Sequence, residues 1–155
     1  MTDHAALAEA YFKDGCNCAQ SVFCAFEDVT GFDHETSLRL GSSYGGGFGR
    51  LREVCGAFSA AAGVLGLLYG YTDLTDPQAK ADHYALVQAL AADFKADSGT
   101  IICRELLGEA GADSSPVPSP RTAEYHATRP CGGLVRRAAE LVDRIMESRQ
   151  AEAEK

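Results

Sequence analysis

The sequence predicts an all-α fold: a single-domain bundle of about five to seven helices around a central apolar helix rich in small residues. Three observations support this prediction. The chain has 155 residues, the length of one ordinary domain, and 46% of them are hydrophobic. Alternating apolar and polar runs bounded by turn residues, which would indicate strands, are almost absent. Apolar residues instead recur at the three- and four-residue spacing of a helix.

Two helices are expected in the first third of the chain. Asn17 is a good N-cap for a helix that runs to about Asp28, and Gly31 follows as a stop signal. Asp33 can cap the next helix, because its side chain can accept a hydrogen bond from a free N–H of the first turn. The glycine-rich stretch 42–49 should end that helix.

The uncharged run 54–72 is the expected central helix. Its length approaches that of a membrane span, but several glycines and polar residues interrupt it, so a buried helix is the better interpretation. The first 15 residues include acidic side chains and lack an apolar core flanked by Lys or Arg. We therefore expect no signal peptide, a cytoplasmic location and no membrane partner.

The second half of the chain completes the predicted single domain of residues 1–155. Asp76 followed by Pro77 is typical of a helix start, and a short helix is expected over 100–107. The Pro- and Ser-rich segment 111–120 is an expected surface loop. The last helix opens at Cys131 and has the clearest apolar stripe, formed by Leu134, Val135, Ala138, Leu141, Val142, Ile145 and Met146.

The charge of the chain restricts its partners. Acidic residues number 22 and basic residues 14, so the net charge is −8. This excess argues against binding to nucleic acid or to an anionic membrane surface. It suits docking to a redox partner protein with a basic surface, and it is compatible with a homodimer.

Cysteine is the informative residue type in this sequence. A chain without a secretory signal uses such cysteines for metal binding or redox chemistry more often than for a disulfide scaffold. The plain alternative is that they pack in the core as small apolar residues. The six are Cys16, Cys18, Cys24, Cys55, Cys103 and Cys131.

Four of the six are expected near the start of a helix and on its apolar side: Cys18, Cys55, Cys103 and Cys131. Free N–H groups and the helix dipole at that position stabilise a thiolate and lower the pKa of a thiol. We expect these four sulfurs to converge in the core of the bundle. Cys24 shares its helix face with Gln20 and Asp28, so it should face a polar side. Cys16 precedes the helix and is at most an auxiliary thiol.

Four thiolates are the ligand set of an iron–sulfur cluster, either [2Fe–2S] or [4Fe–4S], and also of one tetrahedral zinc ion. The favoured interpretation is a cluster-binding, redox-active protein that transfers electrons or senses redox state. Two alternatives stay open: a thiol–disulfide oxidoreductase or redox sensor without a metal, and a zinc-binding structural protein. Nothing in the sequence identifies an organic substrate or a set of catalytic residues, so enzymatic activity is left open.

The glycine-rich stretch does not fit a nucleotide site; a purely structural turn is the favoured interpretation, and a place beside a cofactor is the alternative. It lacks the G-K-[ST] ending of a phosphate-binding loop and follows no strand. Gly45, Gly46 and Gly47 permit a tight turn close to a bulky group, and their N–H groups could donate hydrogen bonds to cluster sulfurs. Arg50 and Arg52 follow; they could offset the negative charge of a cluster, but a surface position is the favoured interpretation.

The histidines give no clear metal signal. His4, His34, His83 and His126 are scattered, without the spacing of a ligand pair. Each is expected to be exposed, and only His126, near Cys131, is a candidate alternative ligand.

Several short motifs together resemble a known family. These motifs are Asn17-Cys18-Ala19-Gln20-Ser21-Val22, Gly45–Arg50, Cys55-Gly56-Ala57, Cys103–Gly108 and Cys131. In this order they resemble the redox-active protein family named for four invariant cysteines and a C-G-A-x-x-G motif (C_GCAxxG_C_C), although Ala60 replaces the last glycine of that motif.

The resemblance implies a helical domain whose four cysteines are Cys18, Cys55, Cys103 and Cys131. It also implies similarity to the cysteine domain of split-Soret cytochromes, for which an iron–sulfur cluster has been considered. This chain lacks a haem-attachment motif, so only the cysteine domain would carry over. We expect Gly56, beside Cys55 in the motif, to border the cofactor together with the three turn glycines.

Overall fold

The computed structural model describes residues 2–155, and within them the fold is all-α, as the sequence predicted. These residues form ten α-helices and one short 3₁₀ helix, with no strand longer than an isolated bridge. Six helices have eight residues or more, in agreement with the expected five to seven: α1 (His4–Lys13), α2 (Cys18–Ala25), α4 (His34–Ser42), α6 (Gly56–Tyr69), α7 (Pro77–Ser98) and α10 (Cys131–Ala153). The shorter segments are α3 (Glu27–Thr30), α5 (Gly45–Phe48), α8 (Cys103–Leu107), η1 (Gly108–Ala112) and α9 (Ala123–Thr128).

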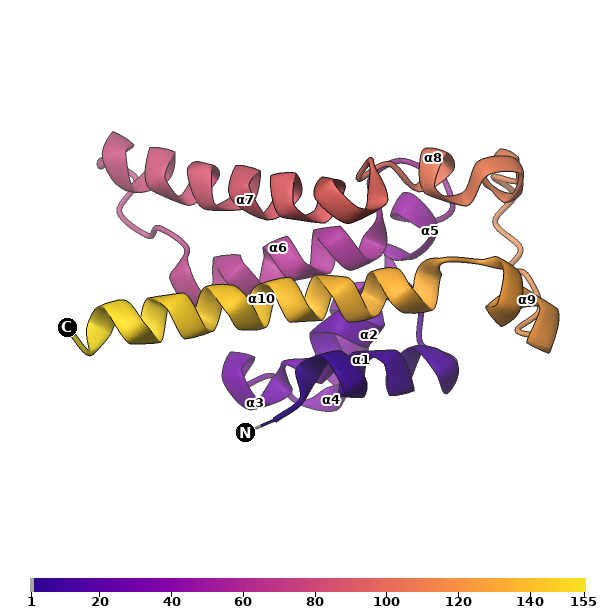
Figure 1. Cartoon of the computed structure of the whole chain (residues 1–155), viewed down its shortest axis with the longest axis horizontal. Helices are drawn as coiled ribbons and strands as arrows, with labels where there is room; N and C mark the ends of the chain where they lie inside the picture. Colours follow the sequence, from indigo (N-terminus) through magenta and orange to yellow (C-terminus); the bar gives the residue numbers. More distant parts are fainter. Residues whose placement is uncertain (1) are drawn as a thin grey trace.

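Helix α6 occupies the centre of the bundle. It lies between α7 and α10 and packs on α2 as well (Figure 1). Its buried residues are mostly small, and small side chains let neighbouring helices approach closely. The prediction of a central, small-residue-rich apolar helix is therefore confirmed. The buried set on α6 is Gly56, Ala57, Phe58, Ala60, Ala61, Val64 and Leu65.

Local capping signals set the helix starts. Asn17 forms a reciprocal capping box with Gln20, and Asp33 accepts a hydrogen bond from the N–H of Thr36. Asp76 caps α7, with proline at its first position. The helix expected to reach Asp28 is interrupted at Phe26, which separates α2 from α3.

The N-terminal helix α1 packs against α2 and α10 and contributes a buried histidine. The side chain of His4 is only 7% exposed; its Nδ1 lies 2.6 Å from an Asp143 oxygen and its Nε2 lies 2.9 Å from an Asp28 oxygen. The expectation that every histidine is exposed is therefore wrong for His4. The reason is tertiary, because its partners come from α3 and α10.

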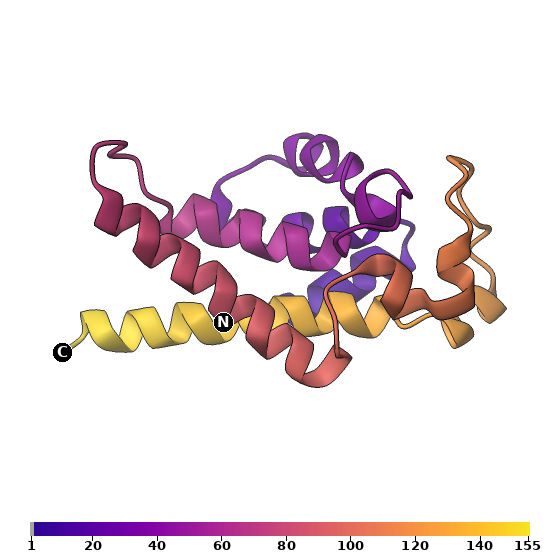
Figure 2. The same cartoon turned by 90° about the horizontal axis from the view of Figure 1, so that it is seen from above.

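One end of the bundle gathers most of the short elements. α5, α8 and α9 lie together there, beside the start of α10 (Figures 1 and 2). The expected loop 111–120 begins within η1, and residues 113–120 join η1 to the segment before α9 and are mostly exposed. Among residues 2–155, no helix combines the length and apolar character needed to cross a membrane.

Candidate metal centre

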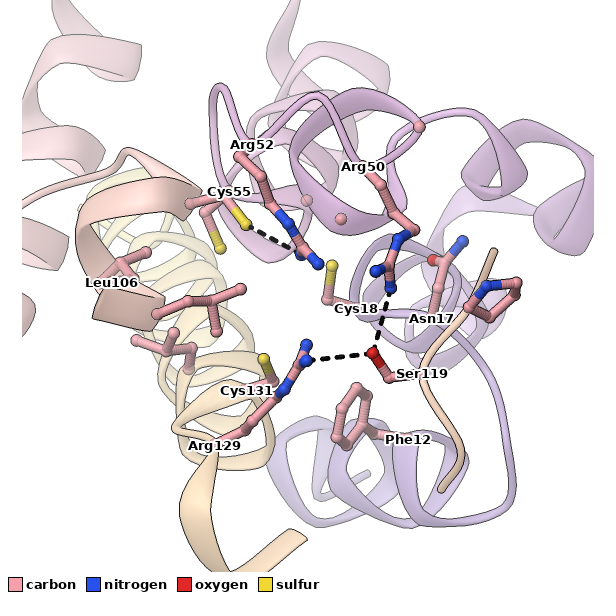
Figure 3. Close-up of a pocket in the computed structure, with 18 of the residues that line it drawn as sticks. Phe12, Asn17, Cys18, Arg50, Arg52, Cys55, Leu106, Ser119, Arg129 and Cys131 are labelled. Carbon is pink, nitrogen blue, oxygen red and sulfur yellow. Dashed lines mark hydrogen bonds between the residues drawn. The ribbon is translucent and has the colours of Figure 1, made fainter. Parts of the chain in front are cut away.

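Four cysteines line one cavity at that end of the bundle. The cavity has a volume of about 280 Å³, and the four are Cys18, Cys55, Cys103 and Cys131. Figure 3 shows Cys18, Cys55 and Cys131 around this space. Each cysteine stands at a helix start: Cys55 is the N-cap of α6, and the others are the first residues of α2, α8 and α10. The structure thus brings together the four cysteines that helix position and the family resemblance had selected.

Backbone pairing fixes two of these cysteines side by side. Val54 and Ile102 form an isolated antiparallel bridge. The N–H of Cys55 donates to the Ile101 carbonyl at 2.7 Å, and the N–H of Cys103 donates to the Glu53 carbonyl at 2.6 Å. This pairing keeps the chain extended before Cys103, so α8 starts there and not at Thr100 as the sequence suggested.

Glycines bring the walls of the cavity close to the sulfurs. A Cβ on Gly56 would lie 2.5 Å from the Cys18 Sγ and 2.6 Å from the Tyr44 carbonyl oxygen. A Cβ on Gly47 would lie 2.7 Å from the Cys103 Cβ. Real Cβ atoms do not approach other atoms so closely, so both positions require glycine for steric reasons.

The segment 46–52 has an unusual backbone. Gly46, Gly47 and Gly49 have positive φ, and so do Phe48 (66°), Arg50 (69°) and Arg52 (63°). A non-glycine residue in this region costs about 1–2 kcal/mol, so the surrounding contacts must hold these three in place. The segment is the tight turn that the sequence predicted, and the backbone N–H of Gly46 acts to lower the pKa of the Cys18 thiol.

Arg52 is a buried part of the site, and the expectation of a surface position is wrong. It is 2% exposed, its Nη1 lies 3.7 Å from the Cys103 Sγ, and its Nε donates to the Asp113 carbonyl at 2.9 Å. Its Nη2 is buried without a hydrogen-bond partner among the described residues. The left-handed backbone at Arg52 and the neighbouring loop bring this side chain inward (Figure 3).

Arg50 also lines the cavity, with only 13% of its side chain exposed. Its Nε donates to the Ser115 carbonyl at 2.7 Å and its Nη2 lies 3.0 Å from Asp113 Oδ2. Arg50 therefore connects the strained turn to the loop 111–120. Pro116, Pro118 and Ser119 of this loop form part of the cavity wall, a role that sequence analysis did not anticipate.

Two further arginines, missed by sequence analysis, line the cavity. Arg129 donates to the Ser119 hydroxyl at 3.1 Å, and Arg121 donates to the Phe12 and Cys16 carbonyls, each at 3.0 Å. Both guanidinium groups lie over the Tyr125 ring, at 4.6 and 4.9 Å from its centroid. Four cationic side chains thus surround the four sulfurs. For these two arginines, the one signal in the sequence was the position of Arg129, two residues before Cys131.

Burial dominates the acidity of these thiols. It raises the pKa of Cys18, of Cys55 and of Cys131, the last to about 11, and the neighbouring cysteines raise these pKa values further. Backbone N–H groups oppose this effect at Cys18 and Cys55, as expected at a helix start, but they do not outweigh burial. The predicted lowering of thiol pKa is therefore wrong for these three cysteines.

The other two cysteines lie outside the cavity. Cys24 does face polar side chains, those of Glu27 and His34, but it is buried, with only 1% exposed. The polar face of α2 is covered by α4: Gln20 Nε2 donates to the Leu38 carbonyl at 3.0 Å. His126 does not line the cavity either; its ring lies at the edge of Phe12.

Comparison with known proteins agrees with this arrangement. Residues 16–145 match a family described as "Putative redox-active protein (C_GCAxxG_C_C)". No curated protein and no solved structure matches the chain. The matched range covers most of the sequence and includes all four cavity cysteines. The chain therefore belongs to the C_GCAxxG_C_C family.

Proposed function

We propose that this protein binds an iron–sulfur cluster through the thiolates of Cys18, Cys55, Cys103 and Cys131 and uses it for electron transfer or redox sensing. The observation that carries this proposal is the convergence of four cysteines from four helix starts on one cavity. Four cysteine thiolates are the usual ligands of both [2Fe–2S] and [4Fe–4S] clusters.

The size of the cavity favours a cluster over a single zinc ion. A structural zinc site is closed, because four sulfurs about 2.3 Å from the metal leave no free space between them. Here about 280 Å³ lies among the side chains, whereas a cavity of about 10–15 Å³ by a comparable measure already holds one water molecule. At Gly56 and at the turn glycines, backbone atoms instead of side chains border part of that space.

The charges around the cavity also suit a cluster. A cluster held by four thiolates is anionic, and reduction makes it more so. Arg52 lies next to Cys103 with a buried, unpartnered Nη2, which is free to donate toward an anionic group in the cavity. Arg50, Arg121 and Arg129 add further positive charge. Buried guanidinium groups offset negative charge effectively because water screens them little.

When bound, a cluster supplies a one-electron acceptor and donor. The chain itself holds the four ligands at helix starts and directs the Gly46 N–H toward Cys18. Hydrogen bonds to ligand sulfur stabilise the more negative, reduced state and raise the reduction potential. We propose that a redox partner protein gives one electron to this centre and the centre passes one on. The net charge of −8 favours a partner with a basic surface.

The test is analysis of iron and acid-labile sulfide in protein purified without oxygen, with absorption and electron paramagnetic resonance spectra. We expect both elements in the native chain and their loss in Cys55→Ser and Cys131→Ser. Cys16→Ser, which changes a half-exposed cysteine outside the cavity, is the matched control and should keep the cluster. A colourless protein would overturn the proposal. One zinc per chain held by the same four cysteines would indicate a structural site, and two fast-reacting thiols would indicate a dithiol protein.

A further inference from the structure

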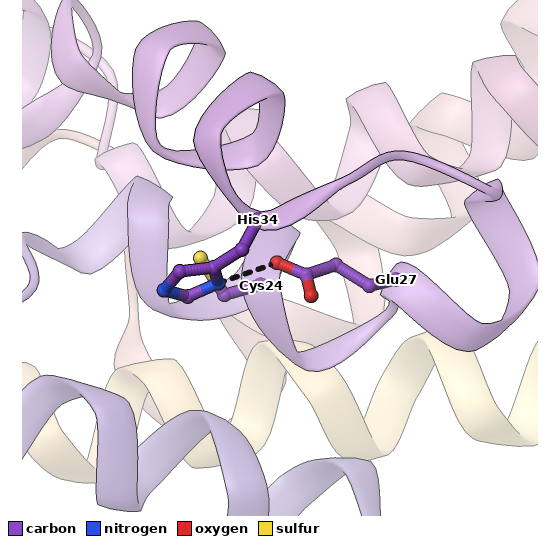
Figure 4. A group of neighbouring side chains, drawn as sticks. All are labelled: Cys24, Glu27 and His34. Atoms are coloured by element: carbon purple, nitrogen blue, oxygen red, sulfur yellow. Dashed lines mark hydrogen bonds and ion pairs between the residues drawn. The ribbon is translucent and has the colours of Figure 1, made fainter.

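A second group of metal-binding side chains lies outside the four-cysteine cavity. The Sγ of Cys24, a carboxylate oxygen of Glu27 and a ring nitrogen of His34 all lie within 4.8 Å of one another. Figure 4 shows the three side chains facing one another from α2, α3 and α4. Nδ1 of His34 is 2.8 Å from the Glu27 Oε1.

This group is separate from the proposed cluster. None of its three residues lines the cavity. Cys24 follows Cys18 by six residues on the same helix, which corresponds to about 9 Å along the helix axis. A ligand bound by one group would therefore not be shared with the other.

We propose that Cys24, Glu27 and His34 form a second metal site, specific for a zinc-type divalent ion and with a fourth position open to solvent. Thiolate, imidazole and carboxylate are the three ligand types that zinc takes in proteins, at about 2.0–2.3 Å. Tetrahedral bonds of that length place ligand atoms roughly 3.3–3.8 Å apart. The three donors already lie within 4.8 Å, so only small side-chain movements are needed.

Burial and access at the group also suit a metal. Cys24 is 1% exposed, whereas the side chains of Glu27 and His34 are 24% and 50% exposed. The sulfur therefore forms the inner wall, and the histidine and the carboxylate leave an entry path from solvent. Capping of α4 by Asp33 fixes the start of the helix on which His34 is the first residue.

Binding of the metal ion rearranges the protons on its three ligands. The ion displaces the proton of the Cys24 thiol to solvent. It also takes the place of the hydrogen bond between His34 Nδ1 and Glu27, whose proton passes through solvent to His34 Nε2, so the imidazole binds as a neutral ligand. Burial, assisted by Cys16 and Glu27, raises the pKa of Cys24 to about 12, so this thiol carries its proton until a metal displaces it. Cys16 lies near Cys24 but is outside the group of three donors.

Zinc titration of the full, reduced chain without oxygen tests this proposal. We expect the native chain to bind one more equivalent of zinc than His34→Gln, or to bind it at least tenfold more tightly. Glu27→Gln should behave like His34→Gln. His83→Gln, which changes a histidine outside both sites, is the matched control and should bind zinc as the native chain does.

Cobalt gives a second readout, because a thiolate ligand to Co²⁺ produces charge-transfer absorption. His34 is half exposed, so its replacement should not unfold the protein, and circular dichroism would verify this. Equal zinc stoichiometry and affinity in the native chain, His34→Gln and Glu27→Gln would overturn the second site. Iron and sulfide content should be the same in all of these variants, so this result would leave the proposed cluster untouched.

Discussion

Replacing Gly56 by alanine should displace the Cys18 sulfur without changing any ligand. The added Cβ would lie 2.5 Å from that sulfur, whereas ordinary van der Waals contact begins near 3.4 Å. The sulfur or the start of α6 must therefore move by about 0.9 Å. Metal–ligand distances tolerate only about 0.2 Å, so the displacement is several times larger than a ligand can accommodate.

The Tyr44 carbonyl oxygen restricts movement of the added Cβ away from the sulfur, because it would lie 2.6 Å from the same Cβ. Overpacking of this kind costs about 1–3 kcal/mol. In a chain of this length each kcal/mol lowers the melting temperature by about 2–4 °C. We expect a lower melting temperature and a large loss of bound iron and sulfide.

Gly66→Ala is the matched control on the same helix. Its Cβ would meet only the His83 Nε2, at 3.9 Å, which is an ordinary contact. Alanine should therefore stabilise α6 by up to about 1 kcal/mol and leave iron and sulfide content unchanged. Thermal unfolding and metal analysis of both variants test this prediction. If Gly56→Ala retains the stability and metal content of Gly66→Ala, the close packing of α6 on the Cys18 sulfur is refuted.

Three further predictions address charge, pH and the core. Arg52→Leu removes the cation 3.7 Å from the Cys103 sulfur, so the reduction potential of the proposed cluster should fall; potentiometric titration against the exposed Arg39→Leu measures this, and equal potentials would contradict it. The Ser115 N–H, and then Arg50, hold the pKa of Asp113 below its usual range. The stability that Asp113 gives the loop 113–119 is therefore present above about pH 4, and it is lost as pH falls through the folded-state pKa of Asp113. The protection factors of this loop's amides against hydrogen exchange should fall in acid, and in Asp113→Asn already at pH 7; unchanged protection in that variant at pH 7 would show that the carboxylate does not hold the loop. Phe94→Ala removes a fully buried ring that packs on Phe58 and should cost about 3–5 kcal/mol in urea unfolding; a cost below about 1 kcal/mol would mean that the core between α6 and α7 is not packed as described.

Local sequence signals were sufficient for the starts of three capped helices and for the choice of four cysteines. Asn17, Asp33 and Asp76 cap helices as predicted, because a cap depends on a side chain and the N–H groups two or three residues away. The same local logic placed Cys18 and Cys131 at helix starts and on apolar stripes. The uncharged run 54–72 also identified α6 as the central helix.

The environment of each sulfur was decided by segments distant in sequence. Arg52 is buried because a left-handed backbone and the loop around Asp113 bring it to Cys103, 51 residues away. Cys24 is buried because α4 covers the polar side of α2. Neither fact can be deduced from helical periodicity, which describes one helix at a time.

The acidity of the cavity thiols and the geometry of the second metal site also depended on the tertiary structure. A helix start alone lowers a thiol pKa, but burial by neighbouring helices reversed that effect at Cys18, Cys55 and Cys131. The approach of Cys24, Glu27 and His34 also required the turn between α3 and α4. The sequence by itself determined where the capped helices α2, α4 and α7 begin, since capping is local. Only the packing of the helices decided which side chains share a site and how much water reaches them.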